Sequence, residues 1–352
     1  MADAMAERFL RMHTVSSSSS HSPPAAPQAV SPHEARPGLL DHALHLRWTL
    51  PLLAVLAALP LVASALGEAF YVGLATRILI FALAATSLNL ILGFGGMVSF
   101  GHAAFIGIGA YAVGILMQQG VVSAWIAWPA AVLASALFAL VVGAISLRTR
   151  GVYFIMITLA FAQMLFYLMV SVKAWGGEDG LSLAGRSVLG GGFDLGDDTR
   201  FYYVVLALFV LAFLVIQRLL NARFGHVLQA IRENETRMLA IGFPVYRYQL
   251  AAFTLAGGLA GLAGALLANQ SSFVSPSLLQ WNQSGLLMVM VILGGVGHLW
   301  GGFIGAVVFL LLEEVLAAYT IHWQFVLGAV LLLVVLAAPR GLAGLLRREP
   351  RA

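Results

Sequence analysis

Long apolar runs separated by short polar connections dominate the chain from residue 49 onward. A helix needs about 20 mostly apolar residues to cross a bilayer, and many of these runs approach or reach that length. They lack the polar and apolar alternation of a membrane β-barrel. We therefore predict an all-α integral membrane protein. The ten expected helices span residues 49–66, 71–92, 101–118, 125–147, 152–172, 201–220, 248–268, 284–295, 302–318 and 323–338.

One polar connection is rich in arginine and predicts a helix of its own. Residues 218–247 read RLLNARFGHVLQAIRENETRMLAIGFPVYR, with five arginines and two glutamates. Within this segment, Val227, Ile231 and Met238 are spaced along one stripe of an amphipathic helix that we expect over Val227–Ile241. A helix in a polar loop between spans is typical of docking to a partner at the membrane surface.

The charges of the connections predict an orientation. Ten spans place both termini on one side, and the charged loops on that side are basic, including the 221–247 loop. Basic loops favour the cytoplasm. The 173–200 loop has more acidic than basic residues and is expected on the periplasmic side. Eight or nine spans remain possible if 49–66 or 284–318 is miscounted.

Composition narrows the class of protein. Charged residues make up 10% of the chain and hydrophobic residues 61%, whereas soluble domains carry about 25% charge. The absence of cysteine excludes disulfides, a thiol nucleophile and a cysteine metal site. Lys173, in the context SVKAW, is the single lysine, so no P-loop for ATP is present. Motifs of serine hydrolases and zinc proteases are also absent, and the sequence does not indicate an enzyme.

The two ends of the chain differ from the 47–340 membrane domain. Residues 1–46 contain a serine run, Ser16–Ser20, and several prolines, so we predict a disordered cytoplasmic tail. No apolar core follows the first charges closely enough for a signal peptide. The tail is either regulatory or a dispensable extension. Residues 341–352 form a second, basic tail.

Two glycine-rich stretches, 89–111 and 294–305, suggest breaks in membrane helices. Small residues allow helices to approach closely, and breaks can expose backbone toward a cavity. Tight packing without any hinge is the alternative, and the likeness of the two stretches only hints at an internal repeat. Together with polar residues inside spans, they provide candidates for a translocation path or hinge: Asn89, Gly95, Gly96, Ser99, Gly101, His102, Gly107, Thr158, Gln163, Gly294, Gly295 and Gly297.

Ionisable residues near these stretches have alternative interpretations. His102 and His298 could form a metal or proton site, but they lack carboxylate companions, so we expect structural hydrogen bonds and no metal. Arg77 lies within the second span and is expected to extend outward, while Glu313 and Glu314 are expected to be solvated near the membrane interface.

Five segments in order resemble one family. They are Arg77–Tyr111, Arg148–Gln163, Trp175–Leu181, Phe224–Gly242 and Leu287–Gly302. Their Ser-x-Gly-His-Ala-x-Phe, Arg-Gly-x-Tyr-Phe and Gly-Gly-x-Gly-x-x-Trp-Gly patterns are similar to those of permease subunits of branched-chain amino acid ABC importers, the LivM-like branch. One departure is Trp175, which replaces the threonine of an external Thr-Gly-Gly-x-x-Gly-Leu motif.

The resemblance implies a type II ABC importer-like permease in a bacterial inner membrane. The implied partners are a second related permease, two cytoplasmic ATPases that bind ATP and Mg, and a periplasmic binding protein. No cofactor is expected on this chain. The resemblance also implies that the arginine-rich loop is an ATPase-coupling loop. Its candidate residues are Arg232, Glu233, Glu235, Arg237, Ala240 and Gly242, and those of the periplasmic loop are Gly176, Gly177, Asp179 and Gly180.

The expected function is transport by alternating access, powered by the partner ATPases. Leucine, isoleucine or valine is the implied solute, with urea, amides or other amino acids as alternatives. A secondary transporter would need an ion site near the membrane midplane, and the sequence offers no convincing one. A purely structural membrane subunit is a third class, against which the long external loop and the glycine-rich breaks argue.

Overall fold

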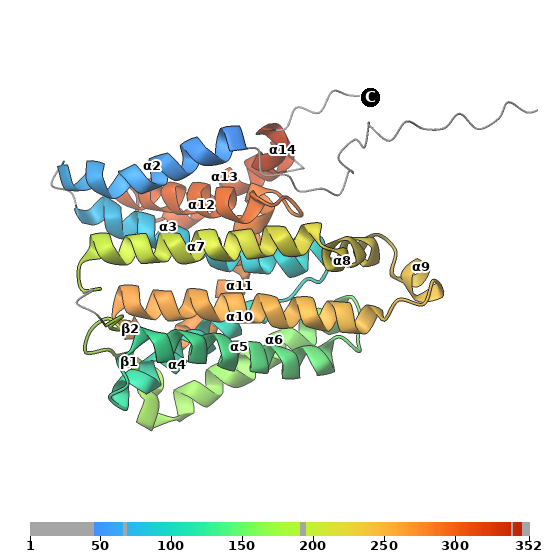
Figure 1. The fold of residues 1–352 in the computed structure, drawn as a ribbon, viewed down its shortest axis with the longest axis horizontal. Coiled ribbons are helices and arrows are strands. Elements are labelled where there is room, and N and C mark those ends of the chain that lie inside the picture. The colour runs from blue at the N-terminus through green and yellow to red at the C-terminus, as the bar shows by residue number, and fades with distance from the viewer. Residues whose placement is uncertain (1–45, 66–68, 191–194, 339–340, 347–352) are drawn as a thin grey trace, which may run out of the picture. The chain divides into compact units, whose positions relative to one another are not determined.

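The computed structural model describes residues 46–65, 69–190, 195–338 and 341–346. The predicted N-terminal tail and most of the basic C-terminal tail lie outside these ranges. The described α-helices, shown in Figure 1, are α2 (Leu46–Ala65), α3 (Ala69–Asn89), α4 (His102–Gln118), α5 (Ala124–Ser146), α6 (Val152–Ser171), α7 (Asp198–Asn221), α8 (Arg223–Glu233), α9 (Glu235–Ala240), α10 (Val245–Ser271), α11 (Trp281–Gly294), α12 (Gly301–Tyr319), α13 (Trp323–Ala337) and α14 (Leu342–Leu346).

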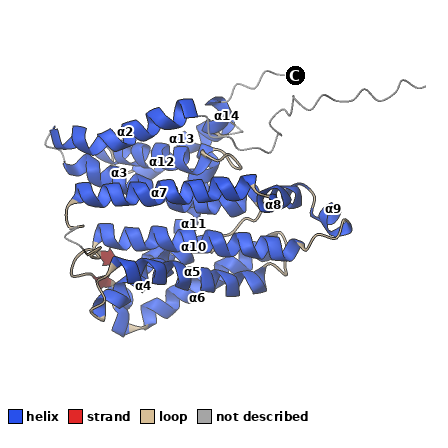
Figure 2. Ribbon diagram, in the orientation of Figure 1, coloured by secondary structure: helices blue, strands red, loops and turns tan. Residues whose placement is uncertain are grey.

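Helix dominates, and the prediction of an all-α membrane fold is confirmed. Each of the ten expected apolar helices is present. Six described helices are long and apolar enough to cross a membrane: α3 with its extension, α5, α6, α7, α10 and α12. The apolar parts of α2, α4, α11 and α13 are shorter. Figure 2 shows how little strand accompanies them, since β1 (Leu181–Ser182) and β2 (Phe273–Val274) are two residues each.

Small residues bring α4, α5 and α10 into close contact. A Cβ added to Gly109 of α4 would lie 2.0 Å from the carbonyl oxygen of Gly261 in α10. A Cβ at Gly257 would lie 2.3 Å from the Cβ of Ala139 in α5. Between these backbones, the ring of Phe105 meets that of Phe253 edge to face, with centroids 5.5 Å apart. Such close approach is how membrane helices gain packing energy without a hydrophobic driving force between them.

A second group of helices packs around α3, which contacts α7, α10, α11 and α12. Of the six candidate spans, α3 is the most buried, since 78% of its 18-residue apolar stretch is buried by other parts of the structure. Its continuation, Leu90–Phe94, is a π-helix whose residues are all buried. The central position of α3 places its glycine-rich end among several other elements.

The single amphipathic helix expected over Val227–Ile241 is wrong in one respect. The chain breaks at Asn234, which has an extended backbone with φ −155° and ψ 94°. The Asn234 side chain accepts a hydrogen bond from the amide of Arg237 at 2.9 Å and thereby caps α9. The apolar stripe itself is confirmed, since Ile231 and Met238 are buried and Val227 packs against them.

Candidate functional site

The two glycine-rich breaks lie side by side. The first separates the π-helix after α3 from α4, and the second separates α11 from α12. Asn89 joins them with its side-chain amide: Nδ2 donates to the carbonyl of His298 at 2.8 Å, and Oδ1 accepts from the amide of Gly297 at 3.1 Å. Segments more than 200 residues apart in sequence therefore form one junction.

Close approach explains glycine at this junction. A Cβ at Gly93 would lie 2.0 Å from Oδ1 of Asn89 and 2.5 Å from the amide nitrogen of Gly297. A Cβ at Gly294 would lie 1.8 Å from the carbonyl oxygen of Gly301 in α12. The contacts demonstrate tight packing, and a hinge role for Gly95, Gly294 and the other glycines stays a prediction.

Arg232 reaches this junction from α8. Its Nη1 donates to the carbonyl oxygen of Gly93. Gly96 and Gly297 both have positive φ, and their backbones lie against the Arg232 side chain: a Cβ at Gly96 would be 3.0 Å from Cγ, and one at Gly297 would be 2.7 Å from Nη1. The arginine expected on a docking face therefore points toward the membrane domain and touches both breaks.

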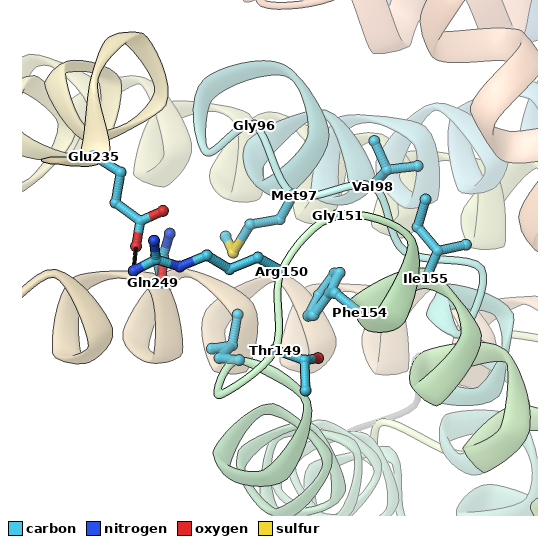
Figure 3. A pocket seen from close by; sticks show the side chains of 11 residues that line it. Gly96, Met97, Val98, Thr149, Arg150, Gly151, Phe154, Ile155, Glu235 and Gln249 are labelled. Carbon is cyan, nitrogen blue, oxygen red and sulfur yellow. Dashed lines mark ion pairs between the residues drawn. The ribbon is translucent and has the colours of Figure 1, made fainter.

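A second tie joins the arginine-rich loop to the α5–α6 connection. Nη2 of Arg150 lies 2.9 Å from Oε1 of Glu235 in α9. Figure 3 shows this ion pair at a cavity of about 160 Å³ whose wall includes Gly96, Phe154 and Gln249. Two thirds of the Arg150 side chain is exposed, so water weakens this ion pair.

The tip of the arginine-rich loop is exposed to solvent. Glu233, Arg237, Ala240 and Gly242 are exposed, and so are the apolar neighbours Leu239 (47%) and Ile241 (63%). Gly242 has φ +90° with nothing within 4 Å of an added Cβ, so the backbone turn rather than crowding favours glycine here. Charged and apolar groups on one projecting tip form a surface suited to a protein partner.

The other path or hinge candidates take part in contacts between helices. His102 shares a hydrogen bond of 2.9 Å with the hydroxyl of Ser87, as expected for a structural histidine. Gly101 is packed against the Thr158 backbone and Gly107 against the Leu279 side chain. Ser99 Oγ accepts from the amide of Gly101. Gln163 Nε2 is buried with no hydrogen-bond partner among the described residues. The described residues also contain no group of three potential metal ligands from His, Asp and Glu.

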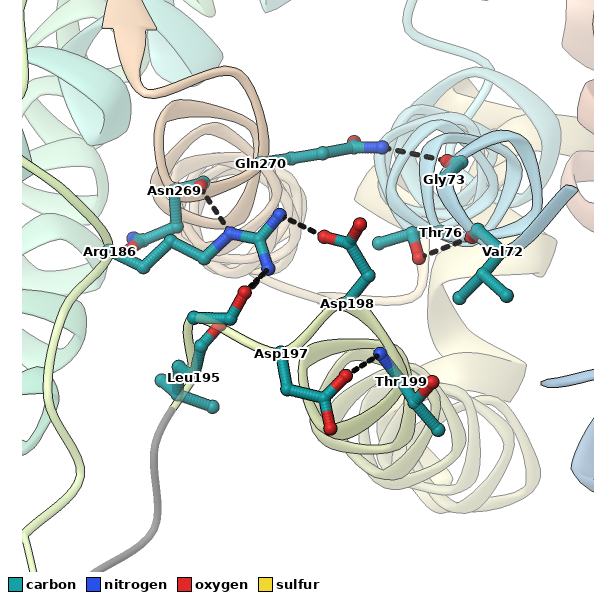
Figure 4. Close-up of polar contacts among 11 residues, drawn as sticks. Val72, Gly73, Thr76, Arg186, Leu195, Asp197, Asp198, Thr199, Asn269 and Gln270 are labelled. Carbon is teal, nitrogen blue, oxygen red and sulfur yellow. Dashed lines mark hydrogen bonds and ion pairs between the residues drawn. The ribbon is translucent and has the colours of Figure 1, made fainter. Parts of the chain in front are cut away.

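The described residues of the 173–200 loop, 173–190 and 195–200, pack onto the helix ends, and the arginine that holds them there was not predicted. Figure 4 shows Arg186 donating to the carbonyl oxygens of Leu195 at 3.0 Å and Asn269 at 3.2 Å and pairing with Asp198. The guanidinium carbon also lies 4.7 Å from the centre of the Phe201 ring. The Arg186 side chain is only 15% exposed, which distinguishes it from the other basic residues of this loop. The sequence alone does not indicate which of these residues is buried.

The glycines of this loop make tight turns beside β1. Gly176, Gly177 and Gly180 all have positive φ. A Cβ at Gly176 would lie 2.1 Å from the carbonyl oxygen of Gly180, so the two ends of the turn touch. Asp179 is exposed between them. The arrangement presents a compact polar surface next to the β1–β2 pair.

The described helices are long and apolar enough to cross a membrane several times, and a charged helical connection joins two of them, so the fold is that of a multi-pass membrane protein. The sequence profile of one family, described as branched-chain amino acid transport system / permease component, matches residues 70–335. The chain belongs to this family, which confirms the resemblance and makes it a transport protein rather than an enzyme.

Relatives agree with this assignment. The chain is 31% identical over 301 residues to the high-affinity branched-chain amino acid transport system permease protein LivM of Salmonella typhimurium, covering 79% of this chain and 71% of LivM. LivM of Escherichia coli is 29% identical with the same coverage. LivH of Salmonella typhimurium, a permease protein of the same named system, is 24% identical over 75% of this chain and 91% of LivH. No solved structure matches.

Proposed function

We propose that this chain is a transmembrane permease subunit of an ATP-binding cassette importer in the bacterial inner membrane. The observation that carries the proposal is the α8–α9 connection, which combines an exposed tip with inward ties to the membrane domain. A loop of this build can receive movement from a cytoplasmic ATPase and pass it to the spans.

The coupling residues divide into two groups. Glu233, Arg237, Ala240 and Gly242 would contact the ATPase at the exposed tip. Arg232 and Glu235 would transmit its movement, because they contact Gly93 and Arg150 of the membrane domain. ATP and Mg would bind to the ATPase. The movement drives alternating access only if the two states of the permease differ in their contacts with that partner.

The orientation and the remaining partners follow from charge and from the relatives. Basic loops favour the cytoplasm, so we place both termini and the α8–α9 tip inside and the 173–200 loop outside. There, Gly176, Gly177, Asp179 and Gly180 would present the turn to a periplasmic binding protein. LivM and LivH are permease proteins named for one system in one organism, which supports pairing with a second, related permease.

The proposed solutes are leucine, isoleucine and valine. The LivM and LivH relatives are named as permeases of a branched-chain amino acid transport system, which supports this assignment. At about 30% identity, urea, amides or other amino acids remain the competing solutes.

Reconstitution tests the proposed function. The chain, its partner permease and the binding protein are placed in proteoliposomes with and without the ATPases, and uptake of radiolabelled leucine and urea is measured. We expect ATP-dependent uptake of leucine only with the ATPases. Uptake of either solute by the permeases alone would instead identify a secondary transporter.

A narrower test concerns docking at the loop tip. Gly242→Val forces a β-branched residue into a positive φ, a backbone conformation that such residues strongly disfavour. We expect weaker association with the ATPase and slower uptake, both beyond what the loss of stability shared with the control variant below would cause. Gly120→Val is the matched control, because Gly120 also has positive φ and open space but lies after α4, in the connection that contacts Val188 of the 173–200 loop. Equal ATPase association by the Gly242→Val variant and the wild type would remove the tip from the docking surface.

A further inference from the structure

Two membrane helices carry opposite charges within their apolar lengths, and the structure joins them. Arg77 lies about two turns inside α3, and Glu313 lies nearly two turns before the end of α12. Nη2 of Arg77 donates to Oε1 of Glu313 at 3.2 Å. The guanidinium carbon is 5.8 Å from the centre of the Phe81 ring, so the arginine lies along its own helix and does not simply extend outward as the sequence suggested.

This pair stands at the margin of the packing between α3 and α12. Phe309 and Leu310, one turn before Glu313 on the same face of α12, are buried in the core. The Glu313 side chain is 19% exposed and that of Arg77 is 40% exposed. Glu314, the next residue, is half-buried. One side of the ion pair is therefore packed against the helix bundle, and the other side is exposed at the surface of the chain.

Contact between lipid hydrocarbon and the exposed side of this ion pair would be unfavourable. Charged side chains within membrane spans usually face a bundle interior or a water-filled cavity, and they mark solute or ion pathways. A charged side chain exposed to this extent would be costly against hydrocarbon. Water in a solute path next to the second permease would solvate it.

We propose that Arg77 and Glu313 form a subsite for a zwitterionic amino acid in the translocation path. This inference rests on the proposed import function. The Arg77 guanidinium would donate to the α-carboxylate of the solute, and the Glu313 carboxylate, with Glu314 beside it, would accept from the α-ammonium group. The single hydrogen bond between two long side chains can open, so one ion pair is exchanged for two.

The chemistry of the subsite separates the competing solutes. An amino acid offers both charges of the exchange, and the half-buried side chains of Ile78 and Phe81 could contact its apolar side chain. Urea has no charge with which to replace either partner. The subsite therefore favours amino acids over urea and other uncharged amides.

Accessibility can be measured without relying on transport, because the chain contains no cysteine of its own. Leu74→Cys places a thiol one turn before Arg77, at a half-buried position. Leu137→Cys, on an apolar stretch of α5 where the leucine is 63% exposed, is the matched control. Both are treated with a charged thiol reagent in the assembled transporter, with cysteine-free partners.

We expect the Leu74→Cys thiol to react about tenfold faster than that of Leu137→Cys, because a thiol must ionise in water to react. Leucine should slow the reaction and urea should not. Equal rates for the two thiols would place Arg77 against lipid or in a dry interface and overturn the proposal. Failure of leucine to protect the Leu74→Cys thiol would overturn it as well. ATP-dependent uptake, measured separately, reports on the import function whichever way the labelling turns out.

Charge variants distinguish a solute subsite from a structural tie. The double variant Arg77→Gln and Glu313→Gln removes both charges of the ion pair together, and we expect assembly and ATPase activity to persist. Leucine uptake per ATP should fall about tenfold or more, as expected for loss of a charge-assisted hydrogen bond. The exchanged pair, Arg77→Glu with Glu313→Arg, restores a structural tie. Recovery of uptake in the exchanged pair would show that the tie, and not contact with the solute, is what matters.

Discussion

The two polar connections of this permease are built in opposite ways. The described part of the 173–200 loop is bound to the helix ends by the β1–β2 pair, by Arg186 and by a 2.6 Å hydrogen bond from the amide of Ser187 to the side chain of Asn269. The arginine-rich connection at the other end of the helices instead extends as α8 and α9, with an exposed tip (Figure 1). The first forms a packed cover over the helix ends, whereas the second is an arm that Arg232 ties to the glycine-rich junction and Glu235 ties to the α5–α6 connection.

The largest difference between the two connections should appear at their glycines. Gly180 has φ +82° and ψ −178°, and a Cβ there would lie 2.6 Å from the carbonyl oxygen of Val274. Gly180→Ala should therefore destabilise the protein by about 3 kcal/mol, from backbone strain and crowding together. Gly242→Ala meets strain alone and should cost about 1 kcal/mol. Denaturant titration of the purified protein measures both, and equal costs would contradict the distinction between cover and arm.

Arg186 should be the main polar support of the cover. Arg186→Met removes hydrogen bonds to three backbone carbonyls and an ion pair, and we expect the free energy of unfolding to fall by about 2 kcal/mol. Arg200→Met is the control, since Arg200 lies 3.6 Å from Asp197 with both side chains about half exposed. Such surface pairs contribute about 0.5 kcal/mol. A similar loss of unfolding free energy in both variants would remove the special role of Arg186.

On the arm, Arg232 should matter more for transport than for stability. Arg232→Gln loses the charged donor to Gly93, and we expect uptake per ATP to fall about tenfold, equivalent to about 1.4 kcal/mol. Arg232→Lys keeps a charged donor and should recover part of the uptake. Arg237→Gln changes an exposed arginine of α9 and should mainly weaken ATPase association. Unchanged uptake by Arg232→Gln would show that the contact with the junction carries no movement.

The smallest effect is expected at the Arg150–Glu235 ion pair. Most of the Arg150 side chain is exposed, so the ion pair should contribute little to stability. In a double-mutant cycle with Arg150→Gln and Glu235→Gln, the free energies of unfolding should give a coupling energy of about 0.5 kcal/mol or less. Uptake should change less than in Arg232→Gln. A coupling energy well above this value would mean that the pair is shielded from water when the ATPase is bound.

Local patterns predicted the helices well because each span is encoded by its own apolar run. The positions of the ten helices, the Ile231–Met238 stripe and the family could all be read from neighbouring residues. The break at Asn234 was missed, since an asparagine within an amphipathic pattern is compatible with either a continuing helix or a cap.

Contacts between distant segments could not be predicted in this way. Arg77 and Glu313 are 236 positions apart, and Asn89 and Gly297 are 208 apart. Their pairing depends on how whole helices pack, which periodicity does not specify. The sequence did identify both glycine-rich breaks, but it did not indicate that they meet or that Arg232 touches both.

The π-helix at the end of α3 has a consequence for how the junction could change shape. In the π-helix Leu90–Phe94, hydrogen bonds join residues five positions apart, whereas in an α-helix they join residues four positions apart. Conversion to α-helical bonding would advance the register by one residue and rotate everything beyond it by roughly 100° about the axis. Gly93 and Gly95 would then face new neighbours without any bend in α3. Such a conversion would change the junction by one defined rotation rather than by a gradual movement.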